Sequence, residues 1–172
     1  MSTPIILQSS GIILRSTTED DLNYVLQTEH DEQNRRFITR WTREQHIAVL
    51  GQADQAHFIV EHDNERAGYV ILAGLANPNQ SVELLRITLS KKEKGLGRST
   101  LRLLQKWIFE EKKAHRLWLD VKDFNDRARH VYESVGFVAE GTLRECVKFE
   151  DGYDSLIIMS ILRREYEANR NE

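Results

Sequence analysis

The 172-residue chain has few of the residues that cross-link a protein, divide it into domains or anchor it in a membrane. Cys146 is the single cysteine, which excludes an internal disulfide and a zinc site built from several thiolates. We therefore expect a reducing, cytoplasmic setting. Only two prolines and no Gly/Ser-rich linker occur, so we expect one domain over residues 1–172. No run of eighteen apolar residues and no basic N-terminal start are present, so neither a membrane partner nor a secretory signal is expected.

The charges are numerous but nearly balanced, with 24 Lys and Arg against 27 Asp and Glu and a formal net charge of -3. This balance argues against a strongly basic surface, so we expect no nucleic-acid partner for the chain as a whole. The six histidines include no i,i+4 pair. We therefore expect structural or surface roles for them, and no metal site.

Hydrophobic patterning predicts an alternation of strands and helices. The expected strands are 12–15, 57–61, 68–72, 82–89, 117–121, one beginning at 137–139, and 153–162. The expected helices begin after Thr17, after Thr42 with Gln45 as its capping-box partner, near Leu101, and after Asp123 or Asn125. Strands first follow one another directly and helices intervene later. We therefore expect a mixed α/β fold, with a centrally antiparallel sheet of six to seven strands flanked by about four helices.

The segment between the strand 82–89 and the next helix is the most informative part of the chain. It contains Gly95-x-Gly97 with several cationic side chains around it: Lys91, Lys92, Lys94 and Arg98. Glycine lets the backbone approach an anion closely, and the first turn of a helix presents free N–H groups. The segment is either a phosphate cradle or a tight turn with solvated lysines. Neither the P-loop string nor the dinucleotide fingerprint occurs.

A second motif follows some thirty residues later, Asn125-x-x-Ala128-x-x-x-Tyr132-x-x-x-Gly136-Phe137. Together with Gly95-x-Gly97, in this order and at this distance, it resembles the GCN5-related N-acetyltransferase superfamily. The resemblance covers most of the chain. The tail is similar to the branch that acetylates protein N-termini and polyamines, through Glu140-Gly141-x-x-Arg144-Glu145, Gly152-Tyr153-x-Ser155 and Met159-Ser160-x-Leu162.

This resemblance implies an N-acetyltransferase in which a primary amine attacks acetyl-CoA directly in a ternary complex, without a metal. It implies a sheet whose strands splay around the acetyl-CoA cleft, and it is compatible with a homodimer. The acceptor would be an amine-bearing small molecule or a protein N-terminus. Lys92 stands where the family pattern usually has Gln or Arg. The implied coenzyme-binding residues are Ile87, Thr88, Leu89, Lys92, Lys94, Gly95, Leu96, Gly97, Arg98, Ser99, Thr100, Asn125, Ala128 and Tyr132.

Two residues are candidates for the proton transfers. The resemblance places Tyr132 at the departing sulfur, where a phenol with a pKa near 10 can protonate a thiolate; the alternative is an aromatic ring packed under the sheet. Glu83 lies in an apolar strand, where partial burial would raise its pKa and make it a base; the alternative is a carboxylate paired with a cation. Arg86 is expected on the opposite face of that strand by simple alternation. Glu140 and Glu145 are outside candidates for the base.

A basic and aromatic stretch near the expected acceptor side consists of Arg35, Arg36, Phe37, Arg40 and Trp41. It could bind an acidic or aromatic acceptor, or it could be a solvated helix connection. Two other functions stay open at this point. One is a non-catalytic acyl-CoA sensor or interaction domain, and the other is a module whose lysine-rich loop binds RNA or phosphorylated protein.

Overall fold

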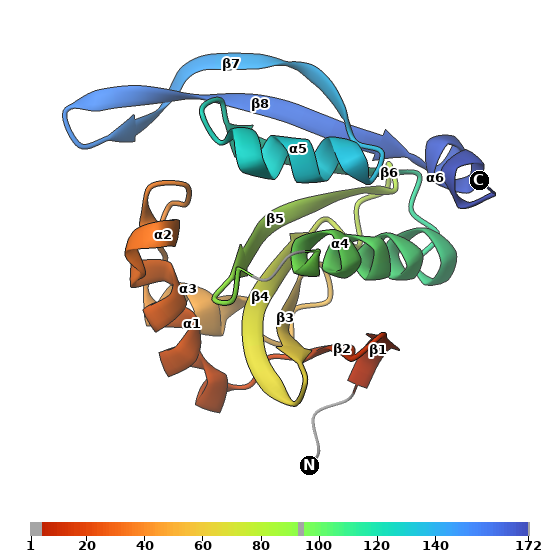
Figure 1. Ribbon diagram of the computed structural model, residues 1–172, viewed down its shortest axis with the longest axis horizontal. Helices are drawn as coiled ribbons and strands as arrows, with labels where there is room; N and C mark the ends of the chain where they lie inside the picture. The colour runs from red at the N-terminus through yellow and green to blue at the C-terminus, as the bar shows by residue number, and fades with distance from the viewer. Residues whose placement is uncertain (1–4, 93–94, 172) are drawn as a thin grey trace.

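The computed structural model describes residues 5–92 and 95–171, with Ile5 described by its backbone alone. Eight strands form one sheet in the order β1-β2-β3-β4-β5-β6-β8-β7 (Figure 1). The strands are β1 (Ile5–Ser9), β2 (Ile12–Ser16), β3 (Ala56–His62), β4 (Glu65–Ala73), β5 (Ser81–Leu89), β6 (Arg116–Lys122), β7 (Val138–Phe149) and β8 (Gly152–Leu162).

Six α-helices, a 3-10 helix (η1) and a π-helix (η2) accompany these strands. They are η1 (Glu19–Asp21), α1 (Leu22–His30), α2 (Glu32–Arg35), α3 (Arg43–Val49), α4 (Leu96–Lys106), η2 (Trp107–Glu111), α5 (Asp126–Ser134) and α6 (Arg163–Arg170). The capping box at the start of α3 is confirmed, because Thr42 Oγ1 accepts from Gln45 N while Gln45 Oε1 accepts from Thr42 N. None of the helices in the described ranges is long and apolar enough to cross a membrane.

The fold class is as expected, but the counts are higher. The sheet has eight strands instead of six to seven, because β1 pairs with β2 across a turn at Ser10-Gly11. The helices also exceed four, because the short α2 and the polar C-terminal α6 carry little apolar periodicity. Neither added helix shows the repeated apolar spacing by which a sequence reveals a helix.

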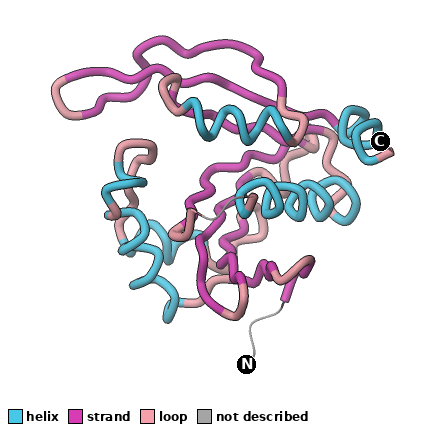
Figure 2. Tube along the Cα trace, in the orientation of Figure 1, coloured by secondary structure: helices cyan, strands magenta, loops and turns pink. Residues whose placement is uncertain are grey.

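The sheet divides where the parallel pair β5–β6 interrupts a series of antiparallel neighbours. Strands β1–β5 form one half, and β6, β8 and β7 form the other. In Figures 1 and 2 the two halves meet beside α6 and diverge toward the β7–β8 hairpin. The crossover between the halves runs through α4 and η2.

Each face of the sheet has its own apolar core. On one face, α4, η2 and α5 pack on β3–β6 and β8 through a cluster that includes Leu101, Ile108, Leu117 and Met159. On the other face, Leu22 and Val25 of α1 pack on β3 and β4. The two cores therefore hold β5 between helices on both sides, with its free edge toward β6.

Candidate active site

The ladder between β5 and β6 is only three residue pairs long. It joins Ser81, Val82 and Glu83 to Arg116, Leu117 and Trp118, and it ends at Glu83. From Leu84 to Leu89, β5 has a strand partner on its β4 side alone. Main-chain groups along the other edge are thus presented to an extended ligand, which can bind them as an added strand.

Beyond Glu83 the strands β5 and β6 diverge, and we call the region between them the splay. A bulge in β5 changes which side chains face the splay. The register moves from Leu72↔Leu84 to Ile71↔Arg86, which leaves Leu85 as the extra residue. Leu84 packs in the core beneath α4, whereas Leu85 packs in the core beneath α1. Arg86 also points to the α1 side, where its Nη1 donates to Glu29 Oε1 at 2.8 Å. The expectation that Arg86 lies on the face opposite Glu83 is therefore wrong, because simple alternation fails at a bulge.

Arg86 and Glu29 belong to a fully buried polar network. The Glu29 carboxylate also accepts from His46 Nε2 at 2.8 Å, from the Tyr69 hydroxyl at 2.7 Å and from the Trp41 main-chain N–H at 3.1 Å. These donors outweigh desolvation and lower the pKa of Glu29. Arg86 is thereby committed to Glu29, and it does not pair with Glu83.

Glu83 lies close to a second carboxylate that the motifs did not indicate, that of Asp120. Because Glu83 is opposite Trp118, Asp120 stands two residues further along β6 on the same face. Burial raises the pKa of Glu83, and the charge of Asp120 raises it further. Burial also raises the pKa of Asp120, against the opposing effects of Lys122 and Arg86. Neither carboxylate has a hydrogen bond or ion pair within residues 5–92 and 95–171. The expected rise in the pKa of Glu83 is confirmed, and the expected alternative of a paired carboxylate is not observed.

Tyr132 of α5 faces the same region. Burial, followed by the charge of Asp120, raises its pKa above the ordinary value of a phenol. Its ring packs edge-on against Phe137 with the centroids 5.7 Å apart. The packing holds the ring, and the raised pKa keeps the hydroxyl in its neutral, protonated form.

The two outside candidates for the base, Glu140 and Glu145, lie in β7. Glu140 accepts hydrogen bonds from Ser160 and from Arg116 at the end of the sheet where β5 and β6 are paired, and these contacts lower its pKa. Glu145 is exposed at an irregularity of β7, where its main-chain N–H donates to Ser155 Oγ. Both are less suited to accept a proton beside the splayed strands than Glu83.

The glycine-rich turn has the form of an anion cradle. Gly95 caps α4 in the left-handed conformation with φ of 84°, and a side chain added there would meet nothing within 4 Å. Ser99 N donates to Gly95 O, so the N–H groups of Leu96, Gly97 and Arg98 precede the first helical hydrogen bond. Open space and unpaired amides together suit a diphosphate. Lys94 lies outside the described residues.

The side chains of the cradle are largely occupied by contacts within the protein. Thr100 Oγ1 donates to Leu96 O at 2.8 Å, and Arg98 Nε donates to Ser134 Oγ of α5 at 3.0 Å. The Thr88 hydroxyl is buried without a partner in the described part of the chain. An anion at this turn would therefore be held mainly by main-chain groups.

Two further predicted residues border the region between β5 and α5. Asn125 caps α5 by accepting from Ala128 N, as its position before the helix predicted. Lys92 Nζ donates to Asn34 Oδ1 of α2 at 2.6 Å, and burial together with Arg127 lowers its pKa. The Lys92 ammonium thus contacts α2, so it is not directed solely at the cradle.

The basic-aromatic stretch is partly structural. Arg36 lies between the rings of Phe124 and Phe149, 4.2 and 4.3 Å from their centroids. It also donates to both carboxylate oxygens of Asp154, which accepts from Lys122 as well. These contacts lower the pKa of Asp154. Arg36 therefore joins α2 to β8 across the open end of the splay and is not a freely solvated side chain.

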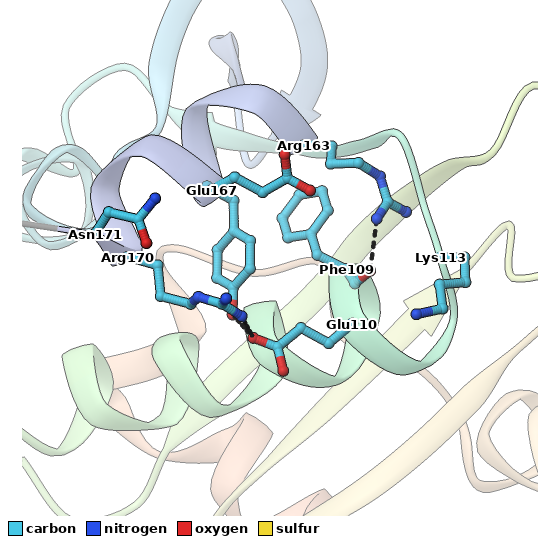
Figure 3. A pocket seen from close by; sticks show the side chains of 8 residues that line it. Phe109, Glu110, Lys113, Arg163, Glu167, Arg170 and Asn171 are labelled. Carbon is cyan, nitrogen blue, oxygen red and sulfur yellow. Dashed lines mark hydrogen bonds and ion pairs between the residues drawn. The ribbon is translucent and has the colours of Figure 1, made fainter.

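Two surface hollows of the described residues lie at opposite ends of the region where β5 and β6 meet and diverge. The larger, about 570 Å³, lies between η2 and α6, where Glu110 accepts from Arg170 (Figure 3). It lies at the end where β5 and β6 are still paired, because α6 follows the residue opposite Arg116. The smaller, about 290 Å³, lies between the α2–α3 connection and β7, on the side where the acceptor is expected. It is lined by Arg35, Ile38, Thr39, Arg40, Val147, Lys148 and Phe149, and we call it the acceptor hollow.

The profile of the Acetyltransferase (GNAT) family matches residues 22–137, more than half of the chain. The chain belongs to the GNAT family. Among curated relatives, the spermidine N(1)-acetyltransferases of Escherichia coli K12 and Vibrio cholerae are 28% and 26% identical, over 92% and 95% of this chain and 89% and 99% of theirs. A crystal structure of spermidine N-acetyltransferase from Vibrio cholerae with CoA and spermine superposes with a TM-score of 0.82 at 22% identity, covering 92% of this chain and 99% of that one.

These findings establish a mixed α/β GNAT fold and an acetyl-CoA-dependent N-acetyltransferase. They do not favour the non-catalytic sensor.

Proposed function

We propose that this GNAT enzyme transfers acetyl to a primary amine by direct attack in a ternary complex at the splay between β5 and β6. The observation that carries the proposal is the placement of Glu83, Asp120 and Tyr132 around the point where the β5–β6 ladder ends. These groups supply a proton acceptor for the incoming amine and a proton donor for the departing sulfur.

Glu83 is the proposed base. An amine arrives mostly as ammonium and must lose a proton before its nitrogen can attack the thioester carbonyl. A carboxylate whose pKa is raised by burial and by Asp120 holds that proton better than an ordinary glutamate. Asp120 adds negative charge beside the ammonium, and we assign it a supporting part in binding and deprotonation.

Tyr132 is the proposed acid. As the tetrahedral intermediate collapses, the carbon–sulfur bond breaks and the thiolate takes the phenolic proton of Tyr132. The attacking nitrogen loses its second proton to the resulting phenolate, which restores Tyr132. Main-chain N–H groups of β5 near Ile87, Thr88 and Leu89 are proposed to stabilise the oxyanion and to pair with the pantetheine arm. The products are the acetylated amine and the free thiol of coenzyme A.

The cradle is proposed to bind the diphosphate of acetyl-CoA through the amides of Gly95, Leu96, Gly97, Arg98, Ser99 and Thr100. Lys92 and Lys94 are proposed to add positive charge, and Asn125 and Ala128 to contact the pantetheine. The fit rests on the open space at Gly95 and on the unpaired first turn of α4. Because main-chain groups dominate, binding depends on the shape of the turn more than on its side chains.

The acceptor class is a primary amine, and two kinds of candidate come from the relatives and the tail motifs. The spermidine N(1)-acetyltransferases among the relatives make a polyamine one candidate, and a protein N-terminus is the other. We also propose a homodimer, which light scattering tests directly.

The test of the function is thiol release from acetyl-CoA with a panel of amines and peptides, with the acetylated product identified by mass. Hydrolysis of acetyl-CoA without any acetylated amine would overturn it.

A further inference from the structure

The acceptor hollow deepens this proposed function and rests on it. We propose that the acceptor is a primary amine that also carries an anionic group, and that the acceptor hollow binds this anion while the amine lies at Glu83 and Asp120. The anion is a carboxylate, either on a small molecule or on the side chain of an acidic residue near a peptide N-terminus.

The charge of the hollow is of one sign. Its lining includes Arg35, Arg40 and Lys148, and no Asp or Glu. Arg40 and Lys148 are exposed, and within the described ranges neither makes a hydrogen bond or an ion pair. Arg35 reaches Glu32 and Glu150 at 3.5 and 3.8 Å, and because both carboxylates are exposed to water these contacts are weak. Two unpaired cations, Arg40 and Lys148, are therefore available to a ligand, and Arg35 adds a third positive charge beside them.

The remaining walls make these cations more effective. Ile38, Val147 and Phe149 supply apolar surface beside the charged groups. A charge pair that is partly shielded from water is stronger than the same pair in bulk solvent. A carboxylate can also accept two parallel hydrogen bonds from the guanidinium of Arg40, which favours it over a neutral amide.

The hollow is connected to both strands of the splay. The carbonyl oxygen of Thr39 accepts from Arg86 Nη2, so this wall is fixed to β5 at its bulge. On the other side the Phe149 ring lies 5.3 Å from Lys122 Nζ. Lys122 follows Asp120 by two residues on β6 and so shares its face. The acceptor side thus has carboxylates at the splay and unpaired cations further out, an arrangement that matches an amine with an anion at its other end.

The walls are held in place before any acceptor binds. Trp41 N donates to the buried carboxylate of Glu29, which fixes the chain just after Arg40. Arg36, which lies between the lining residues Arg35 and Ile38, is held by Asp154 and by two phenyl rings. A preformed site loses little conformational entropy on binding, so its charge can act as a filter for the acceptor.

This charge distribution disfavours a polyamine. Spermidine carries positive charge along its whole length, and its distal ammonium groups would meet Arg35, Arg40 and Lys148. We therefore infer that this chain differs in acceptor from its relatives named for spermidine. The difference would lie in the side chains of the acceptor hollow, and the proposed acetyl donor site would be unchanged.

Matched acceptors test the inference through initial rates of thiol release at constant ionic strength. The small-molecule pair is 4-aminobutanoate against 4-aminobutanamide. The peptide pair is Ser-Glu-Ala-amide against Ser-Gln-Ala-amide, and spermidine completes the set. We expect the anionic member of at least one pair to exceed its neutral partner by about tenfold or more in kcat/KM, and to exceed spermidine. The pair that shows the preference distinguishes a small-molecule acceptor from a peptide.

Variants of the hollow supply the second arm. Arg40→Gln and Lys148→Gln are expected to raise KM for the preferred anionic acceptor several-fold, with little change for its neutral partner. Arg40→Glu is expected to reverse the preference. The matched control is Arg164→Gln, which removes the same charge from an exposed position on α6. All three positions are exposed, so each of the four variants should keep its fold, which circular dichroism checks.

The outcomes separate this inference from the proposed function. Acetyl transfer that prefers spermidine or the neutral acceptors, and that Arg40→Glu leaves unchanged, would overturn the anionic acceptor and leave the transferase mechanism intact. No acetyl transfer to any amine would overturn the proposed function and the inference with it. Equal losses in Arg40→Gln and Arg164→Gln would also contradict the inference, since a site effect must exceed a general charge effect.

Discussion

Glu29 of α1 and Arg86 of β5 form a buried ion pair, 2.8 Å long, that attaches the helical layer to the bulge beside the splay. Removing one member of such a pair leaves the other charge buried and uncompensated. We expect Glu29→Gln to lower the free energy of unfolding by about 3 kcal/mol or more. Urea titration of the variant measures this loss. Glu32→Gln, on exposed α2, is the control, and an equally small change in both variants would contradict a structural role for the pair.

His57 joins the same network, because its Nε2 lies 3.0 Å from Nδ1 of His46, and it should make the protein acid-sensitive. Burial lowers its pKa to about 3, so between pH 6.5 and 3 the unfolded chain binds a proton that the folded chain refuses. Stability then falls as the pH drops below about 6.5, by up to about 1.4 kcal/mol per pH unit from this residue. Urea titrations at pH 7 and pH 5 measure the slope. His57→Gln should flatten it, whereas His130→Gln, at an exposed site, should not.

The cradle glycines should respond differently to alanine. At Gly97 a Cβ would sit 3.6 Å from Leu89 and 3.8 Å from Val131, which are ordinary contacts, so Gly97→Ala should fold normally. At Gly95 the positive φ makes an alanine cost about 1 kcal/mol. We expect both variants to weaken acetyl-CoA binding, and only Gly95→Ala to lower stability. Calorimetric titration with acetyl-CoA and thermal unfolding separate the two effects.

Gly152→Ala is the control for the cradle glycines, since a Cβ there meets nothing within 4 Å. Unchanged acetyl-CoA affinity in both Gly95→Ala and Gly97→Ala would remove the cradle from the proposed binding site.

Tyr132→Phe tests the proposed acid. The ring packing against Phe137 is retained, and only the proton donor is lost. We expect kcat to fall by about a hundredfold, with the dissociation constant for acetyl-CoA nearly unchanged. Steady-state rates and calorimetry give the two numbers, with Tyr166→Phe at the distant α6 as control. Parallel losses in turnover and in binding would argue instead for a packing role.

Glu83 and Asp120 should appear together in the pH dependence of the rate. A base loses its function when it is protonated, so kcat/KM should fall on the acidic side with an apparent pKa above that of an ordinary glutamate. Asp120→Asn removes the charge that helps to raise this pKa, so the acidic limb should move to lower pH. Glu83→Gln should instead reduce the rate at every pH. An acidic limb that Asp120→Asn does not move would contradict the coupling.

Local signals in the sequence predicted the parts of the site that depend on local geometry. The cap at Asn125, the turn at Gly95 and the start of α3 at Thr42 each follow from residues within four positions of one another. The raised pKa of Glu83 was also predictable, because an acid within an apolar strand is desolvated wherever the strand lies in the sheet. These features needed no knowledge of distant contacts.

Features that depend on distant pairing were not predicted. The bulge at Leu85 arises from the register between β4 and β5, and it moved Arg86 to the face of Glu83. Asp120 became part of the site only through the short parallel ladder with β5. The most polar strand, β7, has a largely exposed residue pattern, so only its pairing with β8 defines its length. A Ser-Gly turn before Ile12 was the available signal for β1.

Because the β5–β6 ladder ends early, the acetyl donor and the acceptor would be bound by different kinds of group in one enzyme. The acetyl donor would be bound by main-chain amides, whose positions are kept by any sequence that adopts this fold. The acceptor would be bound by loop and hairpin side chains such as Arg40 and Lys148. Substitution in those loops can therefore redirect the enzyme to a new amine without rebuilding its donor site. A scaffold of this kind can diversify its substrates one surface residue at a time.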